Sequence, residues 1–226
     1  MNFINPLDQE KTNRRLAEAG VILYVPSACY IGSEVTVGKG TRIFPNTVIL
    51  GKTVIGENCT IGPNTVIEDC MIGDSNEIIS SHLTQATVEN RVKIGPFSYL
   101  RPKAHIQNDA KIGDFVEIKN AVIGEGSKAS HLTYIGDADV GKHCNFGCGA
   151  VVVNYNGKEK FRSQIGDHAF IGCNTNLVSP VTVGDFGYTA AGSTIIRNVP
   201  DGALAIARAK QENKEGWVTR KGYLNK

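Results

Sequence analysis

The chain is predicted to be an all-β protein, a parallel β-helix built from six-residue repeats. An apolar residue recurs at every sixth position from Ile31 onward, and glycine often follows it. A small or β-branched residue often stands four places after the apolar one, as at Val35 and Thr47. This period fits neither a helix, which repeats every ~3.6 residues, nor hairpins, which reverse every ~8 to 12 residues. Three short strands per coil, with coils stacked on one another, account for it.

The first 20 residues are predicted to form a short helix that covers one end of the coils. Asn5 suits the N-cap, with Pro6 at the first helical position. Gly20 suits the C-terminal stop. The apolar face would consist of Leu7, Leu16 and Ala17.

Residues 21–200 are assigned to the coils. The apolar series runs from Ile31 to Ile195, with a few shortened steps and longer gaps. At about 18 residues per coil, this stretch would form on the order of nine coils. The predicted inward residues are Ile31, Val37, Ile43, Ile49, Ile55, Ile61, Ile67, Ile72, Ile78, Val88, Ile94, Leu100, Ile106, Ile112, Ile118, Ile123, Ala129, Ile135, Val140, Phe146, Val152, Ile165, Ile171, Leu177, Val183, Thr189 and Ile195.

Residues 201–226 are predicted to form a non-repetitive arm, because Pro200-Asp-Gly ends the pattern. Residues 208–226 hold six basic and two acidic residues, so this tail carries +4 and the remainder −2 of the net +2. A body of that charge argues against general nucleic-acid binding. The basic tail suits a small anionic ligand, although a solvated terminus explains it equally well.

The six cysteines form no Cys-x-x-Cys pair and no zinc-ligand spacing, so no metal site is predicted. The first residues do not read as a secretory signal, and no apolar run approaches the ~18 residues that a membrane span needs. We therefore expect a cytoplasmic protein with reduced thiols and no membrane partner.

The repeat is interrupted between residues 119 and 161, where His131, a tyrosine, asparagines and lysines replace spacer residues. Irregularity in an otherwise regular scaffold often marks its chemistry. A second candidate, Gly38-Lys-Gly-Thr-Arg42, looks like a phosphate loop. It lies within the six-residue register, without the helix that such a loop requires, so it is assigned to the repeat.

The interrupted region and its surroundings contain six further motifs: Arg101-Pro, Gly113-Asp-Phe-Val-Glu-Ile-Lys119, Gly126-Ser-Lys-Ala-Ser-His-Leu-Thr-Tyr-Ile-Gly136, Asn145-Phe-Gly, Asn154-Tyr-Asn-Gly and Lys214-Glu-Gly-Trp217. Together they resemble the acetyltransferase half of the bifunctional glucosamine-1-phosphate acetyltransferase/N-acetylglucosamine-1-phosphate uridyltransferase family. This resemblance implies a left-handed β-helix and a homotrimer with active sites between subunits. The sequence has no βαβ region of the needed length before residue 31, so no uridyltransferase activity is expected.

The resemblance implies acetyl transfer from acetyl-CoA to the amine of glucosamine 1-phosphate. His131 matches the general base, and Lys160 matches a residue close to the reacting centre. Arg101 and Lys119 match ligands of the sugar phosphate, to which arginine offers a bidentate fork and lysine a point charge. The matching polar positions around the sugar and the base are Tyr134, Asn145 and Asn154.

Acetyl-CoA is expected along the later coils. The residues matched to its site are Cys148, Tyr155, Cys173, Ala191, Arg208 and Trp217. Two of them depart from the family, which usually has alanine at position 148 and, at position 173, a serine close to the reaction centre. Cys173 lies two places after the inward Ile171, so its thiol is expected to point outward.

Two other functions stay open. A related acyltransferase for another amino-sugar 1-phosphate, such as galactosamine 1-phosphate, would keep the same phosphate ligands. A non-catalytic trimeric module would show unrelated residues at the site. The joint presence of Arg101, Lys119, His131, Asn154 and Lys160 argues against that module.

Overall fold

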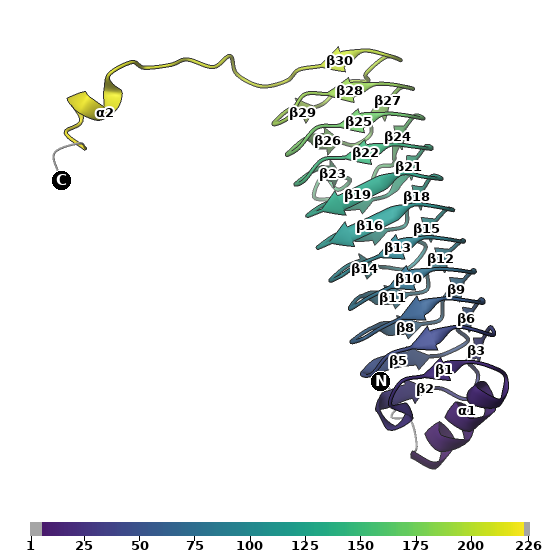
Figure 1. Cartoon of the computed structure of the whole chain (residues 1–226). Coiled ribbons are helices and arrows are strands. Elements are labelled where there is room, and N and C mark those ends of the chain that lie inside the picture. Colours follow the sequence, from purple (N-terminus) through teal and green to yellow (C-terminus); the bar gives the residue numbers. More distant parts are fainter. Residues whose placement is uncertain (1–5, 224–226) are drawn as a thin grey trace.

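The computed structural model describes residues 6–223, which form a helix, a stack of coils and an arm (Figure 1). Each coil adds one short strand to each of three parallel sheets, called A, B and C here in chain order. Strands of neighbouring coils pair in parallel, as Ile43 does with Ile61 in sheet A. This arrangement confirms the predicted parallel β-helix.

Within residues 6–223 the three sheets have eleven, ten and nine strands. Sheet A consists of β1 (Ile22–Leu23), β4 (Arg42–Ile43), β7 (Thr60–Ile61), β10 (Glu77–Ile78), β13 (Lys93–Ile94), β16 (Lys111–Asp114), β19 (Lys128–His131), β22 (Asn145–Phe146), β25 (Phe170–Ile171), β28 (Tyr188–Thr189) and β30 (Leu204–Ala205). Sheet B consists of β2 (Cys29–Ile31), β5 (Thr47–Leu50), β8 (Val66–Glu68), β11 (His82–Thr84), β14 (Tyr99–Leu100), β17 (Glu117–Lys119), β20 (Tyr134–Gly136), β23 (Val151–Val153), β26 (Asn176–Val178) and β29 (Thr194–Ile195). Sheet C consists of β3 (Thr36–Val37), β6 (Val54–Ile55), β9 (Met71–Ile72), β12 (Thr87–Val88), β15 (His105–Ile106), β18 (Val122–Ile123), β21 (Ala138–Val140), β24 (Ser163–Ile165) and β27 (Thr182–Val183).

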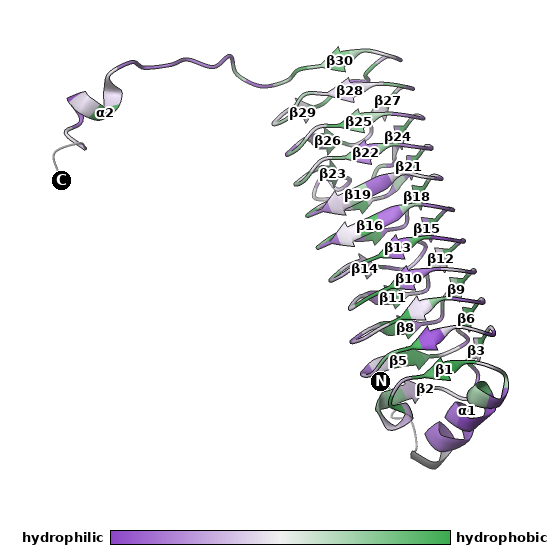
Figure 2. Cartoon of the chain, in the orientation of Figure 1, coloured by the Kyte–Doolittle hydropathy of each residue, from purple (hydrophilic) through white to green (hydrophobic). Residues whose placement is uncertain are grey.

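The helix α1 (Pro6–Glu18) packs beside the first coil, with a largely hydrophilic surface toward the viewer (Figures 1 and 2). Leu16 is buried, and Asn13 donates its side-chain amide to the carbonyl oxygens of Pro26 and Cys29 at 2.8 and 3.1 Å. Gly20 ends the helix with φ of 91°, as predicted. Ala17 is exposed, so its predicted place on the apolar face is wrong. The proposed N-cap, Asn5, lies outside the described residues.

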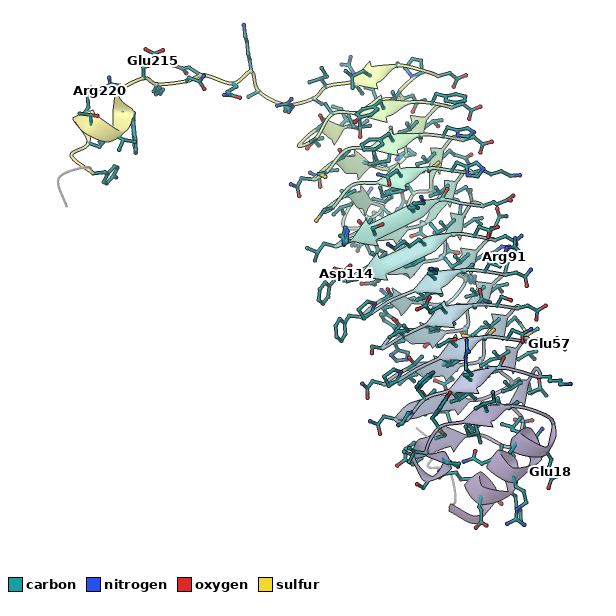
Figure 3. All side chains as sticks on the ribbon, in the orientation of Figure 1. Glu18, Glu57, Arg91, Asp114, Glu215 and Arg220 are labelled. Carbon is teal, nitrogen blue, oxygen red and sulfur yellow. The ribbon has the colours of Figure 1, made fainter. Side chains whose placement is uncertain are left out.

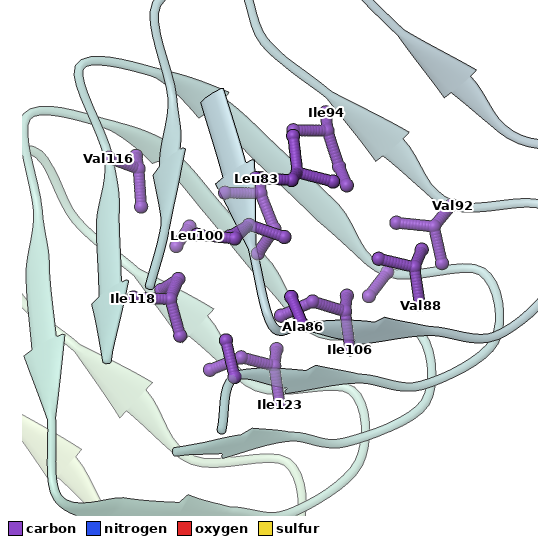
Figure 4. Close-up of a cluster of buried hydrophobic side chains, with 14 of the residues drawn as sticks. Leu83, Ala86, Val88, Val92, Ile94, Leu100, Ile106, Val116, Ile118 and Ile123 are labelled. Carbon is purple, nitrogen blue, oxygen red and sulfur yellow. The ribbon is translucent and has the colours of Figure 1, made fainter. Parts of the chain in front are cut away.

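The inward positions form one continuous core along the stack, and Figure 4 shows one part of it. All of the predicted inward residues are buried except Val37, which is half-buried. Val37 lies on β3, the edge strand of sheet C, so it has a neighbouring strand on one side only. The small residues four places on are buried too, and Thr53 turns its hydroxyl to the carbonyl oxygen of Leu50 at 2.6 Å. Thr53 thereby satisfies its hydroxyl, whereas the buried hydroxyl of Thr47 has no hydrogen-bond partner among the described residues.

The stack is longer than the apolar series predicted. Leu83 is a fully buried residue of sheet B that the six-residue series passed over, because it stands five places from both Ile78 and Val88. The short strands β1 and β30 extend sheet A beyond both ends of the apolar series; β1 still lies within the predicted coil range 21–200, whereas β30 lies beyond it. The eleven strands of sheet A in the described chain therefore bound ten coils rather than nine.

The arm leaves the stack after β30 and ends in the short helix α2 (Trp217–Arg220) (Figure 1). Trp217 is 42 % exposed, and its ring lies 5.5 Å from the ring of Tyr223. Among residues 6–223, no helix has the length and apolar character that crossing a membrane requires.

Candidate active site

The first group of candidate residues lies at the turn from sheet A to sheet B, called the A/B corner here. Asp114 and His131 are paired in register at the ends of β16 and β19. The register continues through Phe146, Ile171 and Thr189, so the residue two places after each of these occupies the equivalent corner position. This A/B column consists of Asp114, His131, Cys148, Cys173 and Ala191. The fold thus brings four sequence-predicted residues into one line.

Asp114 was not singled out from the sequence, yet it makes the main contact of His131. The imidazole Nδ1 lies 2.8 Å from Asp114 Oδ1, and this hydrogen bond lowers the pKa of the Asp114 carboxyl. A carboxylate only accepts, so Nδ1–H is the donor and Nε2 of the neutral ring keeps a free lone pair. Asp114 lies at the edge of the stack, midway along it (Figure 3). The signal that could have found it is the spacing of 17 residues, one coil, before His131.

The second group lies at the turn from sheet B to sheet C, the B/C corner. Arg101 and Lys119 follow the paired residues Leu100 and Ile118, so they are neighbours in successive coils. Arg101 donates to Glu117 Oε1 at 2.7 Å, and this bond raises the pKa of the guanidinium. The guanidinium also lies 5.9 Å from the centroid of the Tyr99 ring. One face of the guanidinium is thereby fixed by contacts within the chain.

Lys119 lies beside Lys160, whose ammonium lowers the pKa of Lys119, and partial burial acts in the same direction. The carboxylate of Asp137 opposes this effect. Burial raises the pKa of Asp137, but hydrogen bonds from Asn120 and Asn154 and the two lysine charges lower it overall. Two cations therefore adjoin one buried carboxylate, which leaves this group with excess positive charge.

Tyr134 and Asn154 join the same group across Gly136. A Cβ atom placed on Gly136 would lie 2.3 Å from the Tyr134 hydroxyl and 2.9 Å from Asn154 Nδ2. Gly136 is in register with Lys119. Only a residue without a side chain leaves room here for both polar groups, so the tyrosine and the asparagine converge above the lysine.

Lys160 is carried by an insertion that lengthens one coil to 25 residues, the separation of Lys142 and Asp167. Tyr155 and Lys160 form an antiparallel bridge, and Phe161 N donates to Asn154 O at 2.9 Å. The tip turns on Asn156, whose side-chain oxygen accepts the backbone N–H groups of Lys158 and Glu159 at 2.9 and 2.8 Å. The insertion is an ordered small hairpin, not a loose loop.

The remaining predicted residues take other positions. Asn145 lies on sheet A, in register between Lys128 and Phe170. Arg208 and Trp217 lie on the exposed arm, but Arg208 approaches the end of the A/B column, since its Cδ would lie 3.9 Å from a Cβ atom on Gly192, the residue after Ala191. Tyr155 donates its hydroxyl to Gly157 O at 2.6 Å, within its own hairpin. Among residues 6–223, no hydrogen bond joins the His131 group to the Lys119 group, and no group of three or more His, Cys, Asp or Glu side chains is placed to hold a metal ion.

The chain resembles known proteins in both sequence and fold. Residues 34–69 match the family model "Bacterial transferase hexapeptide (six repeats)". The chain is 54% identical over 216 residues to "Bifunctional protein GlmU" of Clostridium acetobutylicum and 53% identical over 214 residues to that of Clostridium beijerinckii. Residues 34–69 thus carry hexapeptide repeats, and the chain is similar to GlmU over nearly all of its own length. The match confirms the resemblance predicted from the motifs.

The match covers 96% and 95% of this chain but 47% of each GlmU protein, so the chain spans about half the length of these relatives. Among solved structures, a UDP-N-acetylglucosamine acyltransferase, LpxA from Bacteroides fragilis, superposes with a TM-score of 0.61 at 19% identity. That alignment covers 79% of this chain and 69% of LpxA. At this identity the likeness supports the coil fold alone.

Proposed function

We propose that this chain transfers acetyl from acetyl-CoA to the amine of glucosamine 1-phosphate, giving N-acetylglucosamine 1-phosphate for the synthesis of UDP-N-acetylglucosamine and cell-wall precursors in the cytoplasm. The observation that carries the proposal is the Asp114–His131 hydrogen bond at one edge of sheet B, with a cationic group at the other edge. The similarity to GlmU supports the same reaction.

His131 is the proposed base. Its Nε2 takes a proton from the substrate amine while the nitrogen attacks the thioester carbon, and the carbon–sulfur bond then breaks. The same proton passes from His131 to the leaving thiolate. Asp114 holds Nδ1–H, so it fixes the tautomer and stabilises the imidazolium that forms between the two steps.

Arg101, Lys119 and Lys160 are the proposed ligands of the sugar phosphate. In the free protein the ammonium groups of Lys119 and Lys160 repel each other. A phosphate dianion bound between them would offset this repulsion, which favours phosphate binding. Tyr134, Asn145 and Asn154 offer hydrogen bonds to the sugar. Lys160 matches a residue that the family places close to the reacting centre, so its ammonium would also stabilise charge on the thioester oxygen, with Asn154 beside it.

Acetyl-CoA is proposed to lie along the A/B column above His131. Cys148, Cys173 and Ala191 follow His131 there in successive coils, with outward positions. Tyr155, Arg208 and Trp217 would complete the site. The reaction, as written, uses no metal ion.

We propose a homotrimer in which the arm of one subunit reaches the site of another. Phe97, Phe115 and Leu132 stand one above another next to the A/B column and are 61, 56 and 57 % exposed. Their φ values are 59, 57 and 44°, a costly region for such residues. A neighbouring subunit would bury these side chains and Trp217.

The test is thiol release from acetyl-CoA against a panel of amino sugars. We expect release with glucosamine 1-phosphate and little with glucosamine, which lacks the phosphate. Preference for galactosamine 1-phosphate would select the alternative substrate. If no amine causes thiol release, the alternative of a non-catalytic module would be favoured.

The trimer has a separate test. Deletion of residues 208–226 should abolish activity while the coils stay folded. Mixing that variant with His131→Ala should restore part of the activity, because each supplies what the other lacks. An active monomer in light scattering would contradict the trimer.

A further inference from the structure

Two thiols of the A/B column lie one above the other. Cys148 and Cys173 each follow a paired residue by two places, and Asn174 N donates to Cys148 O at 2.8 Å. A Cβ atom on Gly147 would lie 2.9 Å from Cys173 Sγ, so the sulfur leans toward the coil that holds Cys148. Neighbouring strands lie about 4.8 Å apart, inside the Cα separation of about 4.4 to 6.8 Å that a disulfide spans.

These two cysteines also differ from the other four in accessibility. Cys173 is exposed and Cys148 half-buried, whereas Cys29, Cys59, Cys70 and Cys144 are buried. Burial raises the pKa of the buried thiols, that of Cys70 to about 11. Since the thiolate is the reactive form, an oxidant in solution reaches Cys148 and Cys173 first.

We propose that a peroxide oxidises Cys148 and Cys173 to a reversible disulfide, and that this disulfide stops acetyl transfer. The Cys173 thiolate attacks the peroxide and becomes a sulfenic acid, with loss of water. The Cys148 thiolate then displaces hydroxide from that sulfur, so two thiols and one peroxide give one disulfide and two waters. A dithiol reductant reverses the change by exchange.

The inactivation rests on the proposed function, in which both residues line the path of acetyl-CoA next to His131. A disulfide draws the two side chains together and removes them from their outward positions. The disulfide itself does not depend on that function, because it follows from the register of two adjacent coils alone.

The test oxidises the purified full chain with hydrogen peroxide and measures intact mass, peptide linkage and thiol release. We expect the mass to fall by two hydrogen atoms, a peptide to link Cys148 to Cys173, and most of the activity to be lost. Dithiothreitol should restore both the mass and the activity. Acetyl-CoA should slow the change. Cys144→Ala is the matched control, a buried thiol of the same coil region that should still give the 148–173 link.

Cys148→Ala should show no intramolecular link after peroxide treatment. Dithiothreitol should restore a smaller fraction of its activity than in the unsubstituted chain. The proposal is overturned if peroxide leaves the mass unchanged, links other cysteines, or joins two chains. If the link forms but the chain transfers no acetyl in either the reduced or the oxidised state, the result supports the disulfide and contradicts the proposed function.

Discussion

The coils near the N-terminus, called lower here, and those from Phe97 onward, called upper, share one interior but differ in their surfaces. At the A/B corner, the lower coils place Asn46, Asn64 and Ser80 in the left-handed conformation, and the upper coils place Phe97, Phe115 and Leu132 in the same conformation. Asparagine and serine are common in corner turns, whereas exposed phenylalanine and leucine there cost conformational energy. The backbone is repeated, and only the outward residues change.

The B/C corner shows the same contrast. In the lower coils the outward column includes Leu50, Glu68 and Thr84, and in the upper coils it continues with Arg101 and Lys119. The core beside it stays isoleucine, leucine and valine throughout. The inward positions thus decide the fold, and the outward positions of the upper coils hold the residues of the proposed site. Four substitutions test this division, in order of decreasing effect.

His131→Ala should reduce acetyl transfer by roughly 10²–10⁴-fold, as expected for losing a general base. Its matched control is His105→Ala, because His105 also bonds a carboxylate, Glu89 at 2.8 Å, but on sheet C. The control should keep its activity. Thiol-release kinetics with both variants checks the prediction, and near-full activity of His131→Ala at neutral pH would remove this residue from the mechanism.

Ile55→Ala should lower the free energy of unfolding by roughly 2–5 kcal/mol, because it leaves a cavity in the core. Its neighbour Val54 points outward from the same strand and is 37 % exposed, against 2 % for Ile55. Val54→Ala should cost about 0.5 kcal/mol or little more. Urea unfolding at one protein concentration measures both. Equal losses would show that the two faces of the strand are not energetically distinct.

Asp114→Asn should lower the rate by roughly tenfold or more, because the amide no longer enforces Nδ1–H on His131. The turnover number should fall more than the KM of the sugar phosphate rises. The pH profile of the rate should also move, since the imidazolium loses its carboxylate partner. Asp109→Asn, which changes an exposed carboxylate bonded to Arg91, is the control. An unchanged pH profile would make Asp114 merely structural.

The smallest effect concerns the alkaline limb of substrate binding. Lys160 lowers the pKa of Lys119, so Lys119 loses its charge at lower pH than an ordinary lysine. The KM of the sugar phosphate should therefore rise as pH increases through that lowered value. Lys160→Met removes a proposed phosphate ligand, so the KM should rise at every pH, and it removes the charge beside Lys119, so the limb should also shift to higher pH. Lys158→Met on the same hairpin should do neither. A limb that stays in place would show that Lys119 does not bind the phosphate.

The fold could be predicted because a six-residue period has one common structural solution, and the inward residues followed it closely. Leu83 was missed because two consecutive five-residue steps hide it from a fixed period. The strands β1 and β30 were missed because they lie beyond the repeat, where only pairing with a neighbouring coil defines them.

The candidate site was less predictable. Motifs named His131 and Lys119, but the partner Asp114 depends on which residues become neighbours across coils. That alignment shifts whenever a coil has 17, 18 or 25 residues, as the spacings of Asp114–His131, Arg91–Asp109 and Lys142–Asp167 show. Sequence spacing alone does not decide among them. The convergence of Tyr134 and Asn154 over Gly136 likewise depends on side-chain directions.

The position of the site along the stack has a consequence for how the molecule opens. Each coil touches only the coil before and the coil after it, so fraying begins at the two ends and travels inward. His131 lies on β19, the seventh of the eleven strands of sheet A in the described chain, with coils stacked on both sides. Amide hydrogens near β30 should therefore exchange with solvent first, while those around β16 and β19 are retained longest. The outermost coils therefore unfold locally first, while the coils that hold the proposed site keep their geometry.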